Sequence, residues 1–229
     1  IEKEAELGGL ANRLTATIEG ADIGKYIGDL ISRVSAHEKI QVITNALVVG
    51  YSGFKGNFTT EIMVGPDMEQ RKIEHGVVVL ATGAHEYKPK EFLYGDDPRV
   101  MTQLELADRM KKGEFDEPQQ VVMIQCIGSR NEENPNCSRV CCQTAIKNAL
   151  HIKEKYQDAE VFVLNRDIRT YGLLEDYYTE ARRQGVFFFR FDPEDPPVAE
   201  AAEDGIEVIF TDHVLNRKLS VSTDLLVLS

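Results

Sequence analysis

The sequence predicts an α/β protein whose second half forms a parallel sheet of the nucleotide-binding, Rossmann-like type. From Gln120 onward, short apolar runs alternate with helical segments in the order βαβαβ, which is typical of parallel sheets with right-handed crossovers. The first half instead combines one amphipathic helix with extended segments separated by clusters of Gly, Asn, Ser and Asp, which favour turns. We therefore expect two domains, residues 1–117 and residues 118–229.

The first domain is expected to contain one helix and a small antiparallel meander. Residues 22–36 place apolar side chains on one helical face, with Asp22 as the N-cap. Extended segments are expected at 40–49, 58–64 and 72–80. The third ends in the apolar run 77–80, which we expect to be a buried strand that enters the small-residue turn Ala81-Thr82-Gly83.

A connector is expected between the two domains, over residues 84–117, because Pro89 and Pro98 oppose regular structure. Within it, Thr102 and Glu105 form a capping-box pattern that opens a short helix through Lys112. The second domain is then expected to contain strands at 120–125, 160–164 and 186–191, helices at about 138–155 and 173–183, and three short strands over 206–229.

Composition excludes several classes of function. A net charge of −12 over 229 residues disfavours nucleic-acid binding, which needs clustered Lys and Arg. No apolar run approaches the roughly 20 residues of a membrane span. The chain shows no signal segment, and its acidic, soluble character favours a cytoplasmic location.

All four cysteines crowd into one segment with the spacing C-x10-C-x3-C-C, namely Cys126, Cys137, Cys141 and Cys142. They occupy the expected strand–turn–helix junction, where a dinucleotide-binding domain would carry G-x-G-x-x-G. Nearby basic residues, Arg130 among them, are expected to lower the thiol pKa values. Thiols in place of glycines indicate soft-metal or redox chemistry in place of nucleotide binding.

Spacing alone leaves three interpretations of the cysteines open. An iron–sulfur cluster needs four thiolates around a large body, and a helix from about 138 would put Cys137 and Cys141 on one face. Buried structural thiols are the second interpretation. Zinc or a disulfide is the third, disfavoured because only one pair has zinc-knuckle spacing and intracellular thiols stay reduced.

Two further segments are candidates for binding. Glu2 is expected to end a strand, where an acidic residue commonly binds ribose hydroxyls, and Gly8-Gly9 follows as a turn. In the loop after the second strand of the parallel unit, Arg166 and Arg169 either neutralise an anionic ligand or form an ion pair with Asp167.

Together these segments resemble the A subunit of heterodisulfide reductases, the iron–sulfur flavoprotein subunit of methanogens and many anaerobic bacteria. The resemblance is carried by residues 2–4 with 7–9, residues 79–83, residues 125–130 with 137–142, and residues 166–172. It implies a thioredoxin-reductase-like flavoprotein core in which a pyridine-nucleotide-type domain is inserted into an FAD domain. It further implies FAD and [4Fe–4S] clusters.

The resemblance also implies partners and site residues. Electrons would pass between a hydrogenase or dehydrogenase donor and the B and C subunits, which reduce disulfides. Members of the family use the cysteines as cluster ligands, which on this chain are Cys126, Cys137, Cys141 and Cys142. Glu2, Gly8 and Gly9 would lie at the FAD adenosine, and Ala81, Thr82 and Gly83 would line the flavin side.

Several family motifs are absent from this sequence. The first FAD glycine fingerprint and the C-x2-C-x2-C motifs are missing, so FAD is assigned to the parent protein and the isolated fragment is expected to be inactive. The parallel unit lacks G-x-G-x-x-G, which argues against NAD(P)H binding there. The alternative function is an apo module that docks subunits and carries structural thiols or zinc.

Overall fold

The computed structural model describes residues 1–114 and 117–229, which fall into two compact units. Unit 1 comprises residues 1–16 and 22–85, and unit 2 comprises residues 17–21 and 86–229. The units therefore divide at 85/86, whereas the sequence predicts a boundary at 117/118. The physical reason is that strand β4 (Val100–Thr102) pairs with the central sheet of unit 2 and helix α2 (Gln103–Lys112) packs against it.

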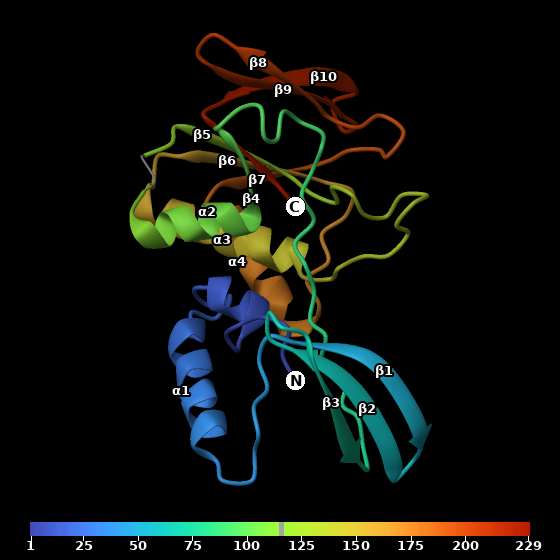
Figure 1. Cartoon of the computed structure of the whole chain (residues 1–229). Coiled ribbons are helices and arrows are strands. Elements are labelled where there is room, and N and C mark those ends of the chain that lie inside the picture. Colours follow the sequence, from blue (N-terminus) through green and yellow to red (C-terminus); the bar gives the residue numbers. More distant parts are fainter. Residues whose placement is uncertain (115–116) are drawn as a thin grey trace. The chain divides into compact units, whose positions relative to one another are not determined.

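Unit 1 contains the predicted helix and meander. Helix α1 (Ile23–Ala36) is capped by Asp22, whose carboxylate accepts a hydrogen bond from the Lys25 amide at 2.9 Å, which confirms the predicted N-cap. Strands β1 (Ala46–Phe54), β2 (Asn57–Val64) and β3 (Glu69–His75) form the expected antiparallel meander in the order β1-β2-β3 (Figure 1). A short 3-10 helix, η1, spans Gly9–Arg13.

One strand prediction for unit 1 is wrong. The apolar run 77–80 is not a buried strand, and its Val79 and Leu80 side chains are 84% and 85% exposed. Glu2 exchanges backbone hydrogen bonds with Ile43 and Ala46 outside the three strands of the meander. A strand forms only beside a neighbour that satisfies its backbone groups, and among the described residues of unit 1 the three-stranded sheet ends with β3 at His75.

Unit 2 is built on a five-stranded sheet with the order β4-β11-β5-β6-β7, and every pairing in it is parallel. Its remaining strands are β5 (Gln120–Ile124), β6 (Glu160–Asn165), β7 (Val186–Arg190) and β11 (Leu225–Leu228). This confirms the predicted parallel α/β architecture. The last strand, β11, lies between β4 and β5. It does not pair with β10, the strand that directly precedes it in the sequence.

Two layers cover this sheet (Figure 1). Helices α2, α3 (Cys141–Lys155) and α4 (Glu175–Arg183) enclose one core with side chains such as Met123, Ile146 and Ala181. Strands β8 (Val198–Ala202), β9 (Gly205–Asp212) and β10 (Arg217–Thr223) form an antiparallel sheet over the other core. A 3-10 helix, η2 (Gly172–Leu174), precedes α4.

The capping box of α2 forms as predicted. The Thr102 hydroxyl accepts from the Glu105 amide at 3.3 Å, and the Glu105 carboxylate accepts from the Thr102 amide at 2.9 Å. Gly113 ends the helix at φ 70°, a left-handed conformation that suits glycine. Among the helices of the described residues, we find none with the length and apolar character that crossing a membrane requires.

Candidate functional site

The four cysteines, called here the cysteine site, lie between the end of β5 and the first turn of α3. All four are free thiols; Cys126 and Cys142 are buried, whereas Cys137 and Cys141 are partly exposed. The helix begins at Cys141, three residues later than the predicted start at 138. Cys137 therefore lies in irregular backbone, and the expectation that Cys137 and Cys141 share a helical face is wrong. The side chain of the N-cap residue, Val140, makes no capping hydrogen bond, which leaves the first amides of the helix to other acceptors.

The backbone of the cysteine segment is held in unfavourable conformations. Cys126, Arg130 and Arg139 have φ values of 68°, 58° and 65°, in the left-handed region that non-glycine residues rarely adopt. Gly128, at φ 63°, adopts the same conformation beside the Tyr87 ring. Such strain clusters at functional sites, and here it falls on one cysteine and two arginines of the segment.

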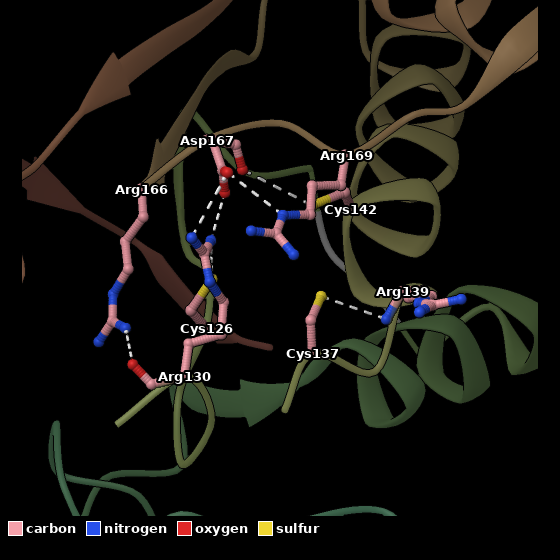
Figure 2. A network of polar contacts seen from close by, with 8 residues as sticks. All are labelled: Cys126, Arg130, Cys137, Arg139, Cys142, Arg166, Asp167 and Arg169. Carbon is pink, nitrogen blue, oxygen red and sulfur yellow. Dashed lines mark hydrogen bonds and ion pairs between the residues drawn. The ribbon is translucent and has the colours of Figure 1, made fainter. Parts of the chain in front are cut away.

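Arg130 and Asp167 connect the cysteine segment to the loop after β6 (Figure 2). Arg130 Nη1 donates to the Cys126 sulfur at 3.7 Å and also forms an ion pair with the Asp167 carboxylate. Arg169 donates from Nε to the same carboxylate at 3.2 Å. Burial alone would raise the pKa of Asp167, but its bonds with Arg130 and Arg169 outweigh burial and lower the pKa.

The two candidate arginines of this loop have different roles. Arg169 forms an ion pair with Asp167, which was one of its two predicted roles; the other was to neutralise an anionic ligand. Arg166 instead donates from Nη1 to the backbone oxygen of Arg130 at 2.6 Å and lies over the Phe191 ring. Arg166 therefore supports the backbone of the Cys126–Arg130 loop. Asp167 was predicted as an ion-pair partner within this loop, but no motif in the sequence indicates its second ion pair, with Arg130.

The thiols differ in how easily they ionise. Cys141 has a pKa lowered first by a hydrogen bond with Cys142 and then by the Ser138 hydroxyl and the open helix amides, against the opposing effect of burial. Its partner Cys142 has a raised pKa because it is the proton donor of this pair and is buried. Burial raises the pKa of Cys126 more than Arg130 lowers it. Of Cys126, Cys141 and Cys142, it is Cys141 whose pKa is lowered as predicted, and the main cause is the hydrogen bond with Cys142 and not the basic residues.

Cys137 and Cys142 each have a polar contact with a nearby backbone group. The Arg139 amide donates to the Cys137 sulfur at 3.4 Å, and the Cys142 sulfur lies 3.9 Å from the Asp167 carbonyl oxygen, a second acceptor within reach of its one thiol proton. Figure 2 shows the Cys137 and Cys142 sulfur atoms directed toward the same space, beside the Arg169 guanidinium. Among residues 1–114 and 117–229, no three His, Cys, Asp or Glu side chains converge closely enough to hold a single metal ion.

The donor set nevertheless has the chemistry that a sulfur-bridged iron cluster requires. Four reduced thiols lie on one segment, N–H groups already donate to the sulfurs of Cys126 and Cys137, and guanidinium groups supply positive charge. Electrostatic interaction links Cys126 with Cys141 and with Cys142. A cluster body is larger than one ion, so its ligands need not converge as tightly.

The predicted FAD residues all lie in unit 1. Gly8 caps η1 at φ 109°, a left-handed conformation that favours glycine. Glu2 accepts a local hydrogen bond from the Glu4 amide at 2.9 Å. Gly9 begins η1, and Ala81, Thr82 and Gly83 have no regular structure. Within the described residues, no hydrogen bond or ion pair joins residues 2–9 to residues 81–83.

Comparison with solved structures shows which fold the chain has. Thioredoxin reductase from T. acidophilum matches with a TM-score of 0.54 and 13% identity, over 99% of this chain and 66% of that one. L-lysine 6-monooxygenase from Pseudomonas syringae matches with a TM-score of 0.53 and 12% identity, over 90% and 56%. The fold is therefore that of thioredoxin-reductase-like FAD oxidoreductases. No protein-family model matches the chain.

Sequence comparison identifies the relatives. The A subunit of the H(2)/formate:CoB-CoM heterodisulfide,ferredoxin reductase of Methanococcus maripaludis is 35% identical over 183 residues, 70% of this chain and 27% of the relative. The iron–sulfur A subunit of the CoB–CoM heterodisulfide reductase of Methanocaldococcus jannaschii is 33% identical over 183 residues, again 70% and 27%. The chain is homologous to part of the heterodisulfide reductase A subunit, which confirms the predicted resemblance. It spans about a quarter of the length of these curated relatives.

Proposed function

We propose that this chain is the cluster-bearing part of an electron-transferring flavin and iron–sulfur oxidoreductase subunit. Cys126, Cys137, Cys141 and Cys142 would be the ligands of one [4Fe–4S] cluster, which supplies one-electron transfer when bound. The observation that carries the proposal is the position of four free thiols at the β5–α3 junction, where this fold otherwise holds a coenzyme phosphate.

The surrounding residues have roles that suit such a centre. Burial of Cys126 and Cys142 keeps water from two of the sulfur atoms. Arg130 donates to the Cys126 sulfur, and Asp167 fixes the Arg130 guanidinium in that position. The amides at the start of α3 point toward Cys141 and stabilise its thiolate. Positive charge and N–H donors together offset the negative charge that a thiolate-bound cluster brings.

FAD and the partner proteins belong to the same proposal. Glu2, Gly8 and Gly9 would contact the adenosine of FAD, and residues 81–83 would line the flavin. The left-handed backbone at Gly8, with φ 109°, favours glycine and supports this placement. In the parent protein, electrons would pass from a hydrogenase or dehydrogenase donor to subunits of the B and C type that reduce disulfides. The relatives named above support this direction because their names are those of CoB–CoM heterodisulfide reductase subunits.

Anaerobic reconstitution with iron and sulfide tests the proposal. The chain is expected to take up about four irons per molecule, in keeping with a [4Fe–4S] cluster, and to show broad visible absorbance. Cys137→Ala should abolish both, whereas Ser220→Ala, a hydroxyl deletion on exposed β10, should change neither. Protein that gains no iron, or a Cys137→Ala variant with unchanged spectrum and iron content, would contradict it. Zinc bound at the cysteines, or no metal at all, would favour the alternative, an apo docking module.

A further inference from the structure

A row of four largely buried polar side chains lies along the carboxyl edge of the parallel sheet. Gln125 directly follows β5, where Val121 and Met123 point into the helix-side core, so strand alternation places Gln125 on that face. The same alternation places Ser229, which directly follows β11, and Asn165, the last residue of β6, on that face, whereas Gln103 is the first residue of α2 and follows β4 directly. The polar row, in sheet order, is Gln103, Ser229, Gln125 and Asn165.

The polar row has hydrogen-bonding capacity that the protein does not use. Five buried side-chain nitrogen or oxygen atoms lack a partner in residues 1–114 and 117–229, and four of them belong to this row. They are Gln103 Nε2, Gln125 Nε2, Gln125 Oε1 and Ser229 Oγ. The Gln125 side chain is 0% exposed. Each unpaired buried polar group lowers the stability of the folded protein by about 1–3 kcal/mol. A ligand that hydrogen-bonds to this row would remove that cost.

Helix α3 aligns the row with the cysteine site. Asn148 donates from Nδ2 to Gln103 Oε1 at 2.8 Å, which leaves Gln103 Nε2 as an open donor. Cys142 lies three residues before Ala145, which packs in the helix-side core, so the two share a helix face toward the sheet. Gln125 is the residue immediately before Cys126. The open donors of Gln125 and Ser229 therefore lie on the side of the sheet that α3, which carries Cys142, covers.

We infer that Gln125, together with Ser229, donates hydrogen bonds to the sulfur atoms of a cluster held at the cysteine site. This inference rests on the proposed function. A primary amide and a hydroxyl are donors, and thiolate or sulfide sulfur accepts. Such bonds stabilise the more negative, reduced cluster and raise its reduction potential. Gln125 and Ser229 are positioning residues that tune the site, and neither acts as a ligand.

The decisive variant is Gln125→Met, which keeps the length of the side chain and removes its N–H donor. In the reconstituted chain we expect the one-electron equilibrium to shift about tenfold toward the oxidised cluster, a potential lower by about 59 mV. The magnetic coupling between the reduced cluster and an exchangeable proton should also weaken. In the metal-free chain the same variant should lose no stability, because the amide it removes has no partner there.

Thr223→Val is the matched control. Thr223 is also buried, at 1% exposed, but its hydroxyl bonds to Gln120 and Leu225 at the opposite end of the sheet. It should lower stability and leave the potential unchanged. Should Gln125→Met fail to retain a cluster, Ser229→Ala decides, with a smaller shift in the same direction expected. Wild-type protein that takes up no iron contradicts the proposed function. An intact cluster whose potential and proton coupling are the same in both variants as in wild type overturns this inference alone.

Discussion

Arg130 donates a hydrogen bond to the sulfur of Cys126 across 3.7 Å, and it does so from a backbone conformation with φ 58° that non-glycine residues rarely adopt. The Asp167 carboxylate, which lies on a different loop, fixes the same guanidinium. The strained backbone and the ion pair between the two loops thus both hold Arg130 in its contact with the Cys126 sulfur. The arrangement resembles the N–H donors that tune metal-bound thiolates.

Removing the Arg130 guanidinium should lower the potential of a cluster at the cysteine site. In Arg130→Gln, the lost positive charge is expected to favour the oxidised state by roughly tenfold, about 59 mV for one electron. A redox titration followed by electron paramagnetic resonance measures it. Arg183→Gln, an exposed change on α4, is the control for net charge. An equal shift in both variants would show that the contact with sulfur is immaterial.

The sequence predicted the parallel unit and the position of the thiols well, because both depend on local patterns. Apolar runs such as that over β5 alternate with helices, and the Thr102 capping box fixes α2 by itself. Strand β8 was missed because its residues, Val198–Ala202, are mostly alanine and glutamate and show no apolar alternation. The place of β11 between β4 and β5 was also missed, since it depends on contacts distant in the sequence.

The details of the cysteine site could not be predicted for a similar reason. Helix α3 starts at Cys141 because the preceding residues, Cys137 and Arg139 among them, follow a strained loop that no simple motif encodes. The apolar run 77–80 has the composition of a buried strand, yet a strand needs a partner, and nothing in the run itself supplies one. Asp167 was expected only as an ion-pair partner of the loop arginines, and its bond to Arg130 on another loop, like the open amide of Gln125, depends on neighbours in space.

Tyr87 makes Gly128 a sensitive position in the cysteine segment. A Cβ at Gly128 would lie 2.3 Å from the Tyr87 ring, and the residue has φ 63°. Gly128→Ala should therefore destabilise the chain by about 1–2 kcal/mol from backbone strain, and by more from displacement of the ring. Gly185→Ala is a matched control, because Gly185 has φ 85° and nothing within 4 Å of its Cβ position. Urea unfolding of both variants measures the difference. Equal losses would show that the Tyr87 contact contributes nothing.

Glu105 should make the stability of unit 2 depend on pH in the acid range. Burial alone would raise its pKa, but hydrogen bonds from Lys88, the Thr102 amide and Tyr94 lower it from 4.5 to about 2. A carboxylate with a lowered pKa in the folded state stabilises above the unfolded value and loses this contribution as pH falls from 4.5 toward 2. After screening by solvent, the loss is expected to be about 1 kcal/mol.

The variant that tests this acid dependence is Glu105→Gln, which keeps the shape of the side chain and removes its charge. It should be less stable than wild type at pH 7, and the gap should shrink as pH falls through the same window. Glu91→Gln serves as a control from the same unit, because the Glu91 carboxylate accepts a local hydrogen bond from the adjacent Lys90 amide at 2.8 Å. A gap between Glu105→Gln and wild type that stays constant from pH 7 to acid would contradict the role of Lys88 and Tyr94.

Cys141 should be the most reactive thiol of the metal-free chain. Its pKa is lowered to about 6, mainly by the hydrogen bond from Cys142, so its thiolate predominates above that pH. Alkylation by iodoacetamide, followed residue by residue with mass spectrometry, should begin near pH 6 at Cys141, while Cys142, whose pKa is raised, stays unmodified. Cys142→Ala removes the donor and should move the onset at Cys141 toward pH 8 to 9, near the ordinary value for a thiol of about 8.5. Cys142→Ser keeps a donor and should leave the onset low. If the alanine and serine variants react alike, the low pKa comes from the helix amides and not from Cys142.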